Sequence, residues 1–448
     1  MNIPGIEEFN HGFVDCIRLG KESENIVRAL CKSPPRTTIT ALALKLYLGR
    51  EAVSKRLKSI RECFGIDDNN QIPILFYIYK PYEYEIHPER LQFQYLRDYG
   101  LVKPIFEDLS TYVPLDSRYY IPRGNIEDEG FGYLTRTGNL LRISGAPQNG
   151  KTSETKRILH LLKKRLDYNT VYIDLKELES SKKNDLKNLL NWFLFLIRER
   201  GEFLELPQVE ISEKSQNIGL ITQCGNYVNK ILEQVPSGLA IGLDNIDSLF
   251  EFPIVCKDFL RMLRVWQGKR GSEPVWRKLK IIIAYTRDYD GDLELNQSPF
   301  NIGEEIMLRN FSEKELKTLI ARHGLPIAPI NPQVKKLMGL VGGIPYLTRL
   351  GLYNIALKRI SLEEILNNAT TSQGIFRDHL SEIRDKLHTN NNRLLAKEMR
   401  KIIDSDRPIN IDNIAAKKLI DKGLIKMEEQ DRYVCSCQLY RLYLKRYL

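Results

Sequence analysis

The apolar positions of the chain change their period along the sequence, and this divides it into three blocks. Before residue 66 apolar residues recur at helical spacing, so the segments 24–33, 37–49 and 50–66 are predicted as helices. Between about residues 112 and 310, short apolar runs alternate with helical stretches. Beyond about residue 331 the pattern is largely helical again. The pattern predicts an α/β core, with a parallel sheet and helices on both faces, between two mainly helical blocks.

Four apolar runs are the predicted strands of the core sheet: LLRIS, TVYIDL, GLAIGLD and LKIIIAYT. Residues 71–86 are predicted as two further strands on either side of Lys80–Pro81. Residues 91–107 are predicted as a helix that Gly100 ends, followed by a connection with a proline, and we expect a domain boundary there. The predicted domains therefore span residues 1–108, 109–310, 311–388 and 389–448.

The third of the N-terminal helices has an apolar face and a basic face. Val53, Leu57, Ile60 and Phe64 recur at helical spacing and should face the core. The turn YLGR precedes this helix, as the second helix of a helix-turn-helix requires. The candidates for DNA contact on its other faces are Arg50, Ser54, Lys55, Lys58 and Arg61. The stretch LALKLYLGREAVSKRLKSIRECFGI resembles the LuxR-type helix-turn-helix, which implies DNA binding, and a solvated basic surface is the alternative.

A second winged-helix pattern is predicted near the C-terminus. From Arg393 the sequence indicates three helices followed by two strands. The final segment CQLYRLYLKRYL is apolar on one face and basic on the other, so a structural role and DNA contact both stay open at this point. Cys435 and Cys437 should share one face of a strand, but no further ligands are close in sequence, so we expect no zinc site.

Composition bounds the class of protein. Of the 448 residues, 42% are apolar and 28% charged, which is typical of a globular chain with two or three domains. The longest apolar run, WFLFLI, is too short to span a bilayer, and the N-terminus has no signal-peptide pattern, so we expect a cytoplasmic protein without membrane contact. The seven scattered cysteines indicate reduced thiols. A net charge of +10 favours a polyanionic partner such as nucleic acid, although a solvated basic surface gives the same value.

The most specific motif is GAPQNGKT, which follows the predicted strand LLRIS and opens a predicted helix. It has the P-loop form GxxxxGK[ST], in which glycines let backbone amides turn toward phosphates and the lysine reaches the β and γ oxygens. The residues predicted to contact the nucleotide here are Gly145, Ala146, Pro147, Gln148, Asn149, Gly150, Lys151, Thr152 and Ser153. The motif predicts ATP as the ligand, with Mg²⁺ held by the hydroxyl of Thr152.

A second Mg²⁺ ligand is predicted at the end of another strand. Asp244 follows an apolar run, so its carboxylate should lie at the carboxyl edge of the sheet. An aspartate that only caps a loop is the structural alternative. The pairing of this aspartate with Lys151 favours the metal role.

From about Val113 to the C-terminus the chain resembles the cyanobacterial AAA-like domain proteins, which are relatives of the STAND signalling NTPases. The pieces that carry the resemblance are VPLDSRYYI, GAPQNGKTS, IGLDNIDSLFEFP, LNQSPFNIG, RHGL, VGGIPYLTRLGLY and CQLYRLY. The resemblance implies an AAA+-like fold with a helical lid and a C-terminal winged helix, which commonly locks the closed state in STAND relatives. It assigns nucleotide contacts to Pro345 of the motif GIP, to the candidate sensor Arg349, to Asp116, Ser117 and Tyr120 beside the adenine, and to Thr286 near the γ-phosphate.

One position departs from the family pattern. The residue after the metal-binding aspartate is usually a glutamate that acts as general base, but here it is Asn245. Asparagine cannot accept a proton at neutral pH, although it can hold a water molecule. If the strand continued, the Asp247 side chain would point to the same face as that of Asn245, but its displacement along the strand would lower the rate of ATP hydrolysis. We expect ATP to be hydrolysed slowly or not at all, and Asn245→Glu to raise turnover if the water site is otherwise intact.

Three functions are compatible with these features. The first is an ATP-dependent molecular switch with a signalling, regulatory or conflict-response output, acting on an effector protein and forming a nucleotide-dependent homo-oligomer. The second is a DNA-binding transcriptional regulator in which ATP is a structural ligand. The third is a DNA-transaction motor of the transposition or helicase kind, which Asn245 disfavours because a motor must turn over ATP.

Overall fold

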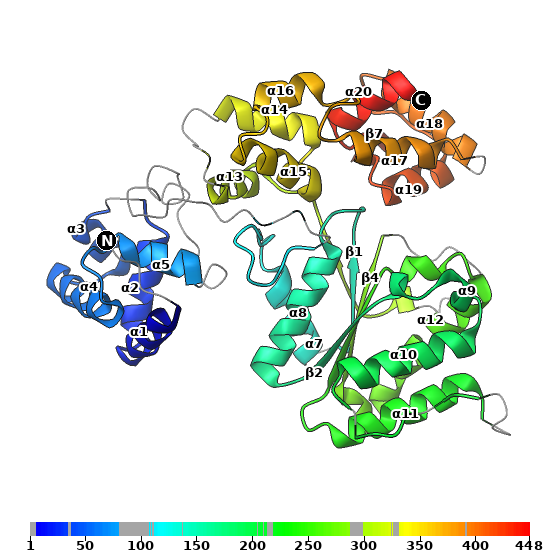
Figure 1. Cartoon of the computed structure of the whole chain (residues 1–448), viewed down its shortest axis with the longest axis horizontal. Helices are drawn as coiled ribbons and strands as arrows, with labels where there is room; N and C mark the ends of the chain where they lie inside the picture. Colours follow the sequence, from blue (N-terminus) through cyan, green and yellow to red (C-terminus); the bar gives the residue numbers. More distant parts are fainter. Residues whose placement is uncertain are drawn as a thin grey trace. The chain divides into compact units, whose positions relative to one another are not determined.

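The computed structural model describes residues 6–34, 37–79, 107, 109, 112–136, 138–203, 205–208, 210–212, 218–286, 299–323, 325, 331–389 and 392–448 (Figure 1). The chain divides into two compact units. The first contains Met1–Ile121, Phe311–Gly343 and Leu347–Asp378, and the second contains Pro122–Asn310, Ile344–Tyr346 and His379–Leu448. Both units combine segments from more than one predicted domain, and the domain boundaries stay predictions. Among the helices of the described residues, none has the length and apolar character that a membrane span requires.

The first unit begins with a cluster of short helices. These are α1 (Ile6–Arg18), α2 (Lys21–Cys31), α3 (Ile39–Leu46), α4 (Arg50–Phe64) and α5 (Gln71–Tyr79). Helices α2, α3 and α4 confirm the three predicted helices, and α1 has no counterpart in the prediction. The predicted apolar face of α4 is confirmed, because Val53, Leu57, Ile60 and Phe64 are all buried.

The helix α5 stands where the sequence pattern predicts a strand, so that prediction is wrong. At its start the Gln71 side chain accepts a hydrogen bond from the Asp68 amide at 3.2 Å. Ile72 and Phe76 are buried one helical turn apart, and the Phe76 ring meets the Phe64 ring edge-on at 5.6 Å. The aromatic and β-branched residues favour a strand locally, but packing against α4 requires helical spacing. The other strand of that pair and the helix predicted after it lie outside the described residues.

The described part of the region predicted as the lid, residues 311–388, contains α13 (Glu313–Arg322), α14 (Asn331–Val341), α15 (Pro345–Ala356), α16 (Leu362–Asn368) and, at its end, α17 (Arg377–Leu387). Helices α13 and α16 each begin with a capping box of a serine and a glutamate. Between α14 and α15, Gly343 has a φ of 70°, and its carbonyl accepts a hydrogen bond from the Phe311 amide at 2.8 Å. A Cβ at this position would lie 2.3 Å from the Phe311 carbonyl oxygen. The first residue of the GIP motif therefore has to be glycine.

The second unit contains a five-stranded parallel sheet with the order β2-β3-β4-β1-β5. Its strands are β1 (Leu140–Ser144), β2 (Asn169–Asp174), β3 (Leu239–Asp244), β4 (Leu279–Tyr285) and β5 (Glu304–Met307). The first four confirm the predicted strands. In the described sheet β5 lies at the edge beside β1, and Ile306 is the one buried residue of this strand, so its sequence carries no strand pattern. This is the α/β fold that the sequence predicts, a parallel sheet enclosed by helices.

Helices cover both faces of this sheet (Figure 1). One face packs against α7 (Ile126–Arg136) and α8 (Lys151–Leu166), and the other against α10 (Leu186–Arg200), α11 (Leu220–Gln234) and α12 (Pro253–Ser272). Short elements are α9 (Ser180–Lys183) and the 3₁₀ helices η2 (Leu175–Glu177), η3 (Ile246–Leu249), η4 (Pro274–Lys278) and η5 (Pro299–Asn301). Helix α8 lies close to β3, since a Cβ on Gly242 would be 2.8 Å from side-chain atoms of Leu159 and Thr155. This close packing fixes the start of α8 relative to the sheet edge.

The C-terminal part of the second unit is a winged helix with the elements α17 (Arg377–Leu387), α18 (Arg393–Asp404), α19 (Asn413–Asp421), β6 (Ile425–Glu429), β7 (Arg432–Cys435) and α20 (Gln438–Tyr447). Two helices, not the predicted three, lie between Arg393 and the antiparallel β6–β7 hairpin. The chain between α18 and α19 is extended instead. Ile409 exchanges backbone hydrogen bonds with Tyr433 of β7 at 2.9 and 3.2 Å.

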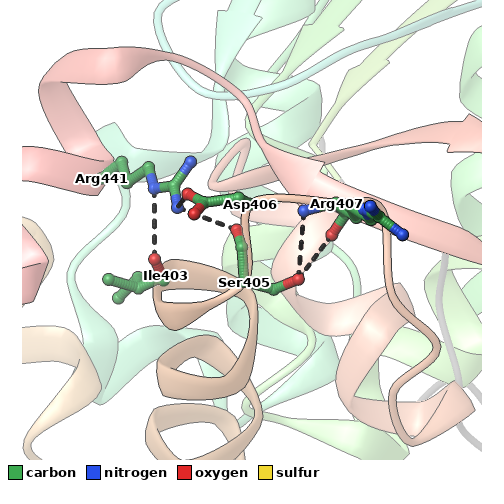
Figure 2. Close-up of polar contacts among 5 residues, drawn as sticks. All are labelled: Ile403, Ser405, Asp406, Arg407 and Arg441. Carbon is green, nitrogen blue, oxygen red and sulfur yellow. Dashed lines mark hydrogen bonds and ion pairs between the residues drawn. The ribbon is translucent and has the colours of Figure 1, made fainter.

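One arginine joins the last helix to the end of α18 (Figure 2). From α20, Arg441 donates to the carbonyls of Ile403 at 3.1 Å and Ser405 at 2.8 Å, and it pairs with Asp406 at 2.7 Å. The Ser405 hydroxyl in turn donates to the Arg407 carbonyl at 2.7 Å. Because helix ends leave carbonyls without intrahelical partners, these contacts stabilise the end of α18.

Candidate nucleotide site

The parallel strands of the second unit all end at one edge of the sheet, and this edge collects the predicted site residues. The loop GAPQNGKT leaves β1 there, Asp174 ends β2, Asp244 ends β3 and Thr286 follows β4. The register pairs Asp174 directly with Asp244. Strand β4 lies between β3 and β1, so Thr286 stands between the Asp244 strand and the loop. The structure thus brings together the loop, the predicted metal ligands and the predicted polar sensor.

The P-loop is anchored by residues outside the motif. The side-chain amide of Asn149 donates to the Leu308 carbonyl at 2.8 Å, beyond strand β5. Arg123 is only 6% exposed, and its guanidinium donates a hydrogen bond to the Asn149 carbonyl at 2.7 Å. Gly150 has a φ of 89° and precedes the first residue of α8, so the helix N-terminus opens directly at the loop. Backbone amides and the helix dipole at this point favour an anion.

Lys151 folds back over the loop. Its ammonium donates to the carbonyls of Gly145 at 2.8 Å and Ala146 at 2.9 Å, and the residue is 9% exposed. Burial lowers the pKa of Lys151 to about 8, while the charges of Asp247 and Asp244 oppose this shift. The ammonium therefore stands where a triphosphate could exchange the two carbonyls for phosphate oxygens.

Affinity for Mg²⁺-ATP is expected to fall as pH rises. Below pH 8 the Lys151 side chain is protonated and can neutralise a phosphate, and above pH 8 the free protein holds it increasingly as the neutral amine. Between pH 7 and pH 9 we expect about a tenfold loss of affinity, measured by titration with a fluorescent ATP analogue. In K151R the guanidinium stays charged, so its affinity should vary little over this range. A wild-type affinity that is constant or increases with pH would contradict the expectation.

Asp244 is the centre of the polar contacts at this edge. It is 1% exposed, and its Oδ2 accepts hydrogen bonds from the Thr152 hydroxyl and, at 2.7 Å, from the Tyr172 hydroxyl. Burial and then the charge of Asp244 raise the pKa of Tyr172 above its usual value, so this hydroxyl remains a donor. A buried carboxylate beside a threonine hydroxyl is a hard oxygen donor set. Such a pair fits Mg²⁺, which takes one or two protein ligands and completes its shell with phosphate and water.

Asn245 does not face the loop but turns toward β2. It has a φ of 55°, a left-handed conformation that asparagine adopts more readily than most residues. Its side-chain amide donates to Asp174 Oδ1 at 2.8 Å, and its backbone amide donates to Asp244 Oδ1 at 2.8 Å. The prediction that Asp247 continues the strand is wrong, because β3 ends at Asp244 and Asp247 lies in the 3₁₀ helix η3. The left-handed residue is what turns the chain out of the strand.

The remaining predicted contacts lie partly in the first unit. There Arg349 of α15 is 7% exposed, pairs with Glu107 at 3.6 Å and lies over the Tyr119 ring at 5.2 Å. The Tyr120 carbonyl accepts a hydrogen bond from Arg322. Among the other predicted residues Asp116 is exposed, Ser117 is buried, and Pro345 is the first residue of α15. Their contacts with adenine or phosphate stay predictions.

The winged helix reaches the P-loop within the second unit. Gly423, which follows α19, has a φ of 70°, and a Cβ there would lie 2.8 Å from the Ala146 Cβ. The hydrogen bond from Lys386 is the main cause that lowers the pKa of Glu382 in α17, and Lys176 of η2 lies within electrostatic range and adds a smaller contribution. The turn after α19 therefore contacts the loop that Lys151 closes.

Comparison with known proteins decides the family. The profile of the AAA-like domain family matches residues 109–446. The chain belongs to this family. A search of curated proteins found no match.

The AAA-like domain also matches solved structures. A Walker-type ATPase of Pyrococcus abyssi is 16% identical, with a TM-score of 0.51 over 75% of this chain and 99% of the other. The ORC2 protein of Aeropyrum pernix, in its ADPNP and ADP complexes, is 16% identical, with a TM-score of 0.45 over 77% of this chain and 97% of the other. The first similarity shows that the AAA-like domain shares the fold of a P-loop ATPase.

Sequence reasoning misses three residues at this site of the AAA-like domain: Arg123, Tyr172 and Asp174. Arg123 stands two positions after the segment VPLDSRYYI, which gives no sign that it supports the P-loop. Asp174 is the acid near the end of the predicted strand TVYIDL, as Asp244 is at the end of GLAIGLD, and this is a signal that could have selected it. Only the register between β2 and β3 shows that the two carboxylates are neighbours.

Proposed function

We propose that this AAA-like domain protein binds ATP with Mg²⁺ and acts as a molecular switch that hydrolyses ATP slowly. The support is the combination of a P-loop at a helix N-terminus, a buried lysine that closes it, and the Thr152–Asp244 pair. Asn245 supplies an amide where a general base is expected, so turnover below roughly one per second is consistent with the site. Slow turnover suits a switch, which must persist in its nucleotide-bound state.

The observation that carries the switch is the contact between Gly423 and Ala146. Phosphates that draw the Lys151 ammonium away from the Gly145 and Ala146 carbonyls change the loop on which the winged-helix turn rests. The nucleotide and the winged helix would then favour different conformations of the P-loop. A switch needs this difference, because a ligand shifts an equilibrium only when it binds the two states with different affinity. The output we propose is the release of the winged helix to an effector protein or to another copy of the chain.

Gly423→Ala is expected to mimic ATP. The added Cβ meets Ala146 and adds strain at a positive φ, so the winged helix should leave the loop without nucleotide. We expect limited proteolysis of the free variant to resemble that of the ATP-bound wild type, with faster cleavage around the C-terminal helices. Gly65→Ala is the matched control, because Gly65 also follows a helix at a φ of 63° but has no neighbouring atoms within 4 Å. If ATP changes neither the proteolytic pattern nor the hydrodynamic size of the wild-type protein, the switch is ruled out.

DNA binding by the N-terminal helices is the second candidate function, and the exposed face of α4 favours it. Arg50, Ser54, Lys55 and Lys58 are exposed on this helix. Tyr47, in the turn before α4, is 97% exposed and has a φ of 54°, an unusual conformation for a bulky side chain. The fifth predicted contact, Arg61, donates to Asn69 Oδ1 at 2.9 Å and is half-buried. We therefore expect four of the five residues to be available to phosphates.

Charge reversal tests this candidate. If α4 binds duplex DNA, Lys55→Glu with Lys58→Glu should weaken binding at least tenfold and reduce the salt dependence by about two phosphate contacts. Fluorescence anisotropy at several salt concentrations measures both quantities. The control is Lys397→Glu with Arg400→Glu, two exposed positions on α18. Loss of binding in the control alone would assign the DNA contact to the C-terminal winged helix instead.

A further inference from the structure

The interaction between Asp174 and Asn245 places a carboxylate beside the position where the sequence lacks one. Asp174 is in register with Asp244 on the neighbouring strand, so both side chains leave the sheet at the same edge and on the same face. The Asn245 amide donates to Asp174 Oδ1 at 2.8 Å. The acid that is missing after Asp244 is therefore present one hydrogen bond away, on β2.

The contacts of Asp174 fix one oxygen and leave the other for water. Its Oδ1 also accepts the Lys176 amide at 2.9 Å, at the start of η2. In the described part of the chain both hydrogen bonds to this carboxylate end on Oδ1, so Oδ2 remains available to a water molecule. Burial lowers the pKa of Lys156 and Lys183, and the charge of Asp174 partly opposes this in both, so two cations lie within its electrostatic range.

Two other carboxylates lie at this edge and are engaged elsewhere. Asp244 is satisfied by Thr152, Tyr172 and the Asn245 backbone, and it is the predicted metal ligand. The charge of Asp247 acts on Lys151, where it partly opposes the lowering of the pKa by burial. Asp174 differs from both, because among the described residues its two hydrogen bonds leave Oδ2 available for proton transfer.

We propose that Asp174 is the general base for ATP hydrolysis in this chain and that Asn245 positions it; this rests on the ATP-binding function proposed above. In this step a water oxygen forms a bond to the γ-phosphorus, and the bond from that phosphorus to the oxygen bridging the β-phosphate breaks. The bridging oxygen leaves with the electron pair as part of ADP. The proton of the water passes to the Asp174 carboxylate, which releases it to solvent. A base can act directly or through one intervening water, and the hydrogen bond from Asn245 at 2.8 Å fixes the position of the Asp174 carboxylate.

The test separates binding from hydrolysis by measuring Mg²⁺-ATP affinity and single-turnover hydrolysis on the full chain. Asp174→Asn keeps the cap on η2 and should keep ATP affinity within about threefold, while the rate of hydrolysis falls about 100-fold. Asp174→Ser retains the cap in the same way and provides a second variant. Asp174→Glu keeps a carboxylate and should recover part of the rate. Asn245→Ala should lower the rate about tenfold with affinity unchanged, as expected when a positioning residue is removed.

Asp167→Asn is the matched control. It makes the same chemical change at the exposed end of α8, at a φ of 55° where asparagine is tolerated, and should alter neither quantity. Wild-type hydrolysis that survives in Asp174→Asn, or that is lost in Asp247→Asn alone, would overturn the assignment. A wild type that binds ATP but never hydrolyses it would also overturn it. A wild type without affinity for ATP would instead refute the proposed function itself.

Discussion

Lys151→Ala should abolish ATP binding at micromolar nucleotide. The ammonium that this substitution removes lies 2.8 and 2.9 Å from two loop carbonyls and is almost fully buried. Bulk water therefore has little access to this position and cannot solvate a phosphate there in place of the ammonium. A triphosphate in the loop of this variant would face those carbonyl oxygens without the opposing positive charge. We expect a loss of at least about 100-fold in affinity, about 2.7 kcal/mol, in calorimetric titration with Mg²⁺-ATP.

The matched control for this variant is Lys163→Ala. Lys163 lies in the last turn of the same helix α8 and is exposed, so its removal changes net charge and helix composition equally without touching the loop. Its affinity for ATP should equal that of the wild type. If Lys151→Ala binds ATP as tightly as Lys163→Ala does, the nucleotide site is elsewhere and the proposed switch has no basis.

Asn245→Glu is expected to give little or no gain in ATP turnover unless Asp174 is changed with it. The new carboxylate would meet Asp174, which now accepts a hydrogen bond from the Asn245 amide at 2.8 Å, and like charges at this distance repel. Glutamate also tolerates the left-handed conformation at this position less well, at a cost of roughly 1–2 kcal/mol. This expectation replaces the simpler one from the sequence, in which the single substitution raises turnover.

The double variant Asp174→Asn with Asn245→Glu should behave differently. An amide on β2 can donate to the carboxylate after Asp244, so the pair is restored with its two members exchanged. A misplacement of a catalytic group by about 1 Å can lower the reaction rate about 100-fold. Moving the carboxylate from the end of β2 to the end of β3, nearer the P-loop, should therefore raise the rate of steady-state phosphate release by about 100-fold. Adding Lys151→Ala to the double variant should remove this activity, which assigns it to the pocket. A double variant no faster than the wild type would show that the site cannot orient water.

Local patterns were sufficient for most of the core but not for the elements that depend on packing. The strands β1, β3 and β4 are largely apolar runs that are buried on both faces, so they can be recognised from the sequence alone, whereas β2 buries only Val171 and Ile173. Strand β5 has a single buried residue, and its assignment depends on pairing with β1. Helix α5 shows the opposite case, where strand-forming residues become helical because Phe76 packs on Phe64. Both differences have the same cause. Where the hydrophobic pattern of a segment is weak or ambiguous, contacts with the rest of the folded chain determine its secondary structure.

The sequence by itself determined the P-loop, because the groups of GAPQNGKT that would bind phosphate are the backbone amides and the lysine of consecutive residues. It also determined that an amide stands where a general base is expected. The tertiary structure decided what that amide does. Asp174 and Asn245 are far apart in the chain, and only the parallel register of β2 and β3, followed by a left-handed residue, brings them within 2.8 Å. The contact of Gly423 with Ala146 is of the same kind. Motifs made of consecutive residues are fixed by local geometry, whereas pairs made across strands and domains exist only once the chain has folded.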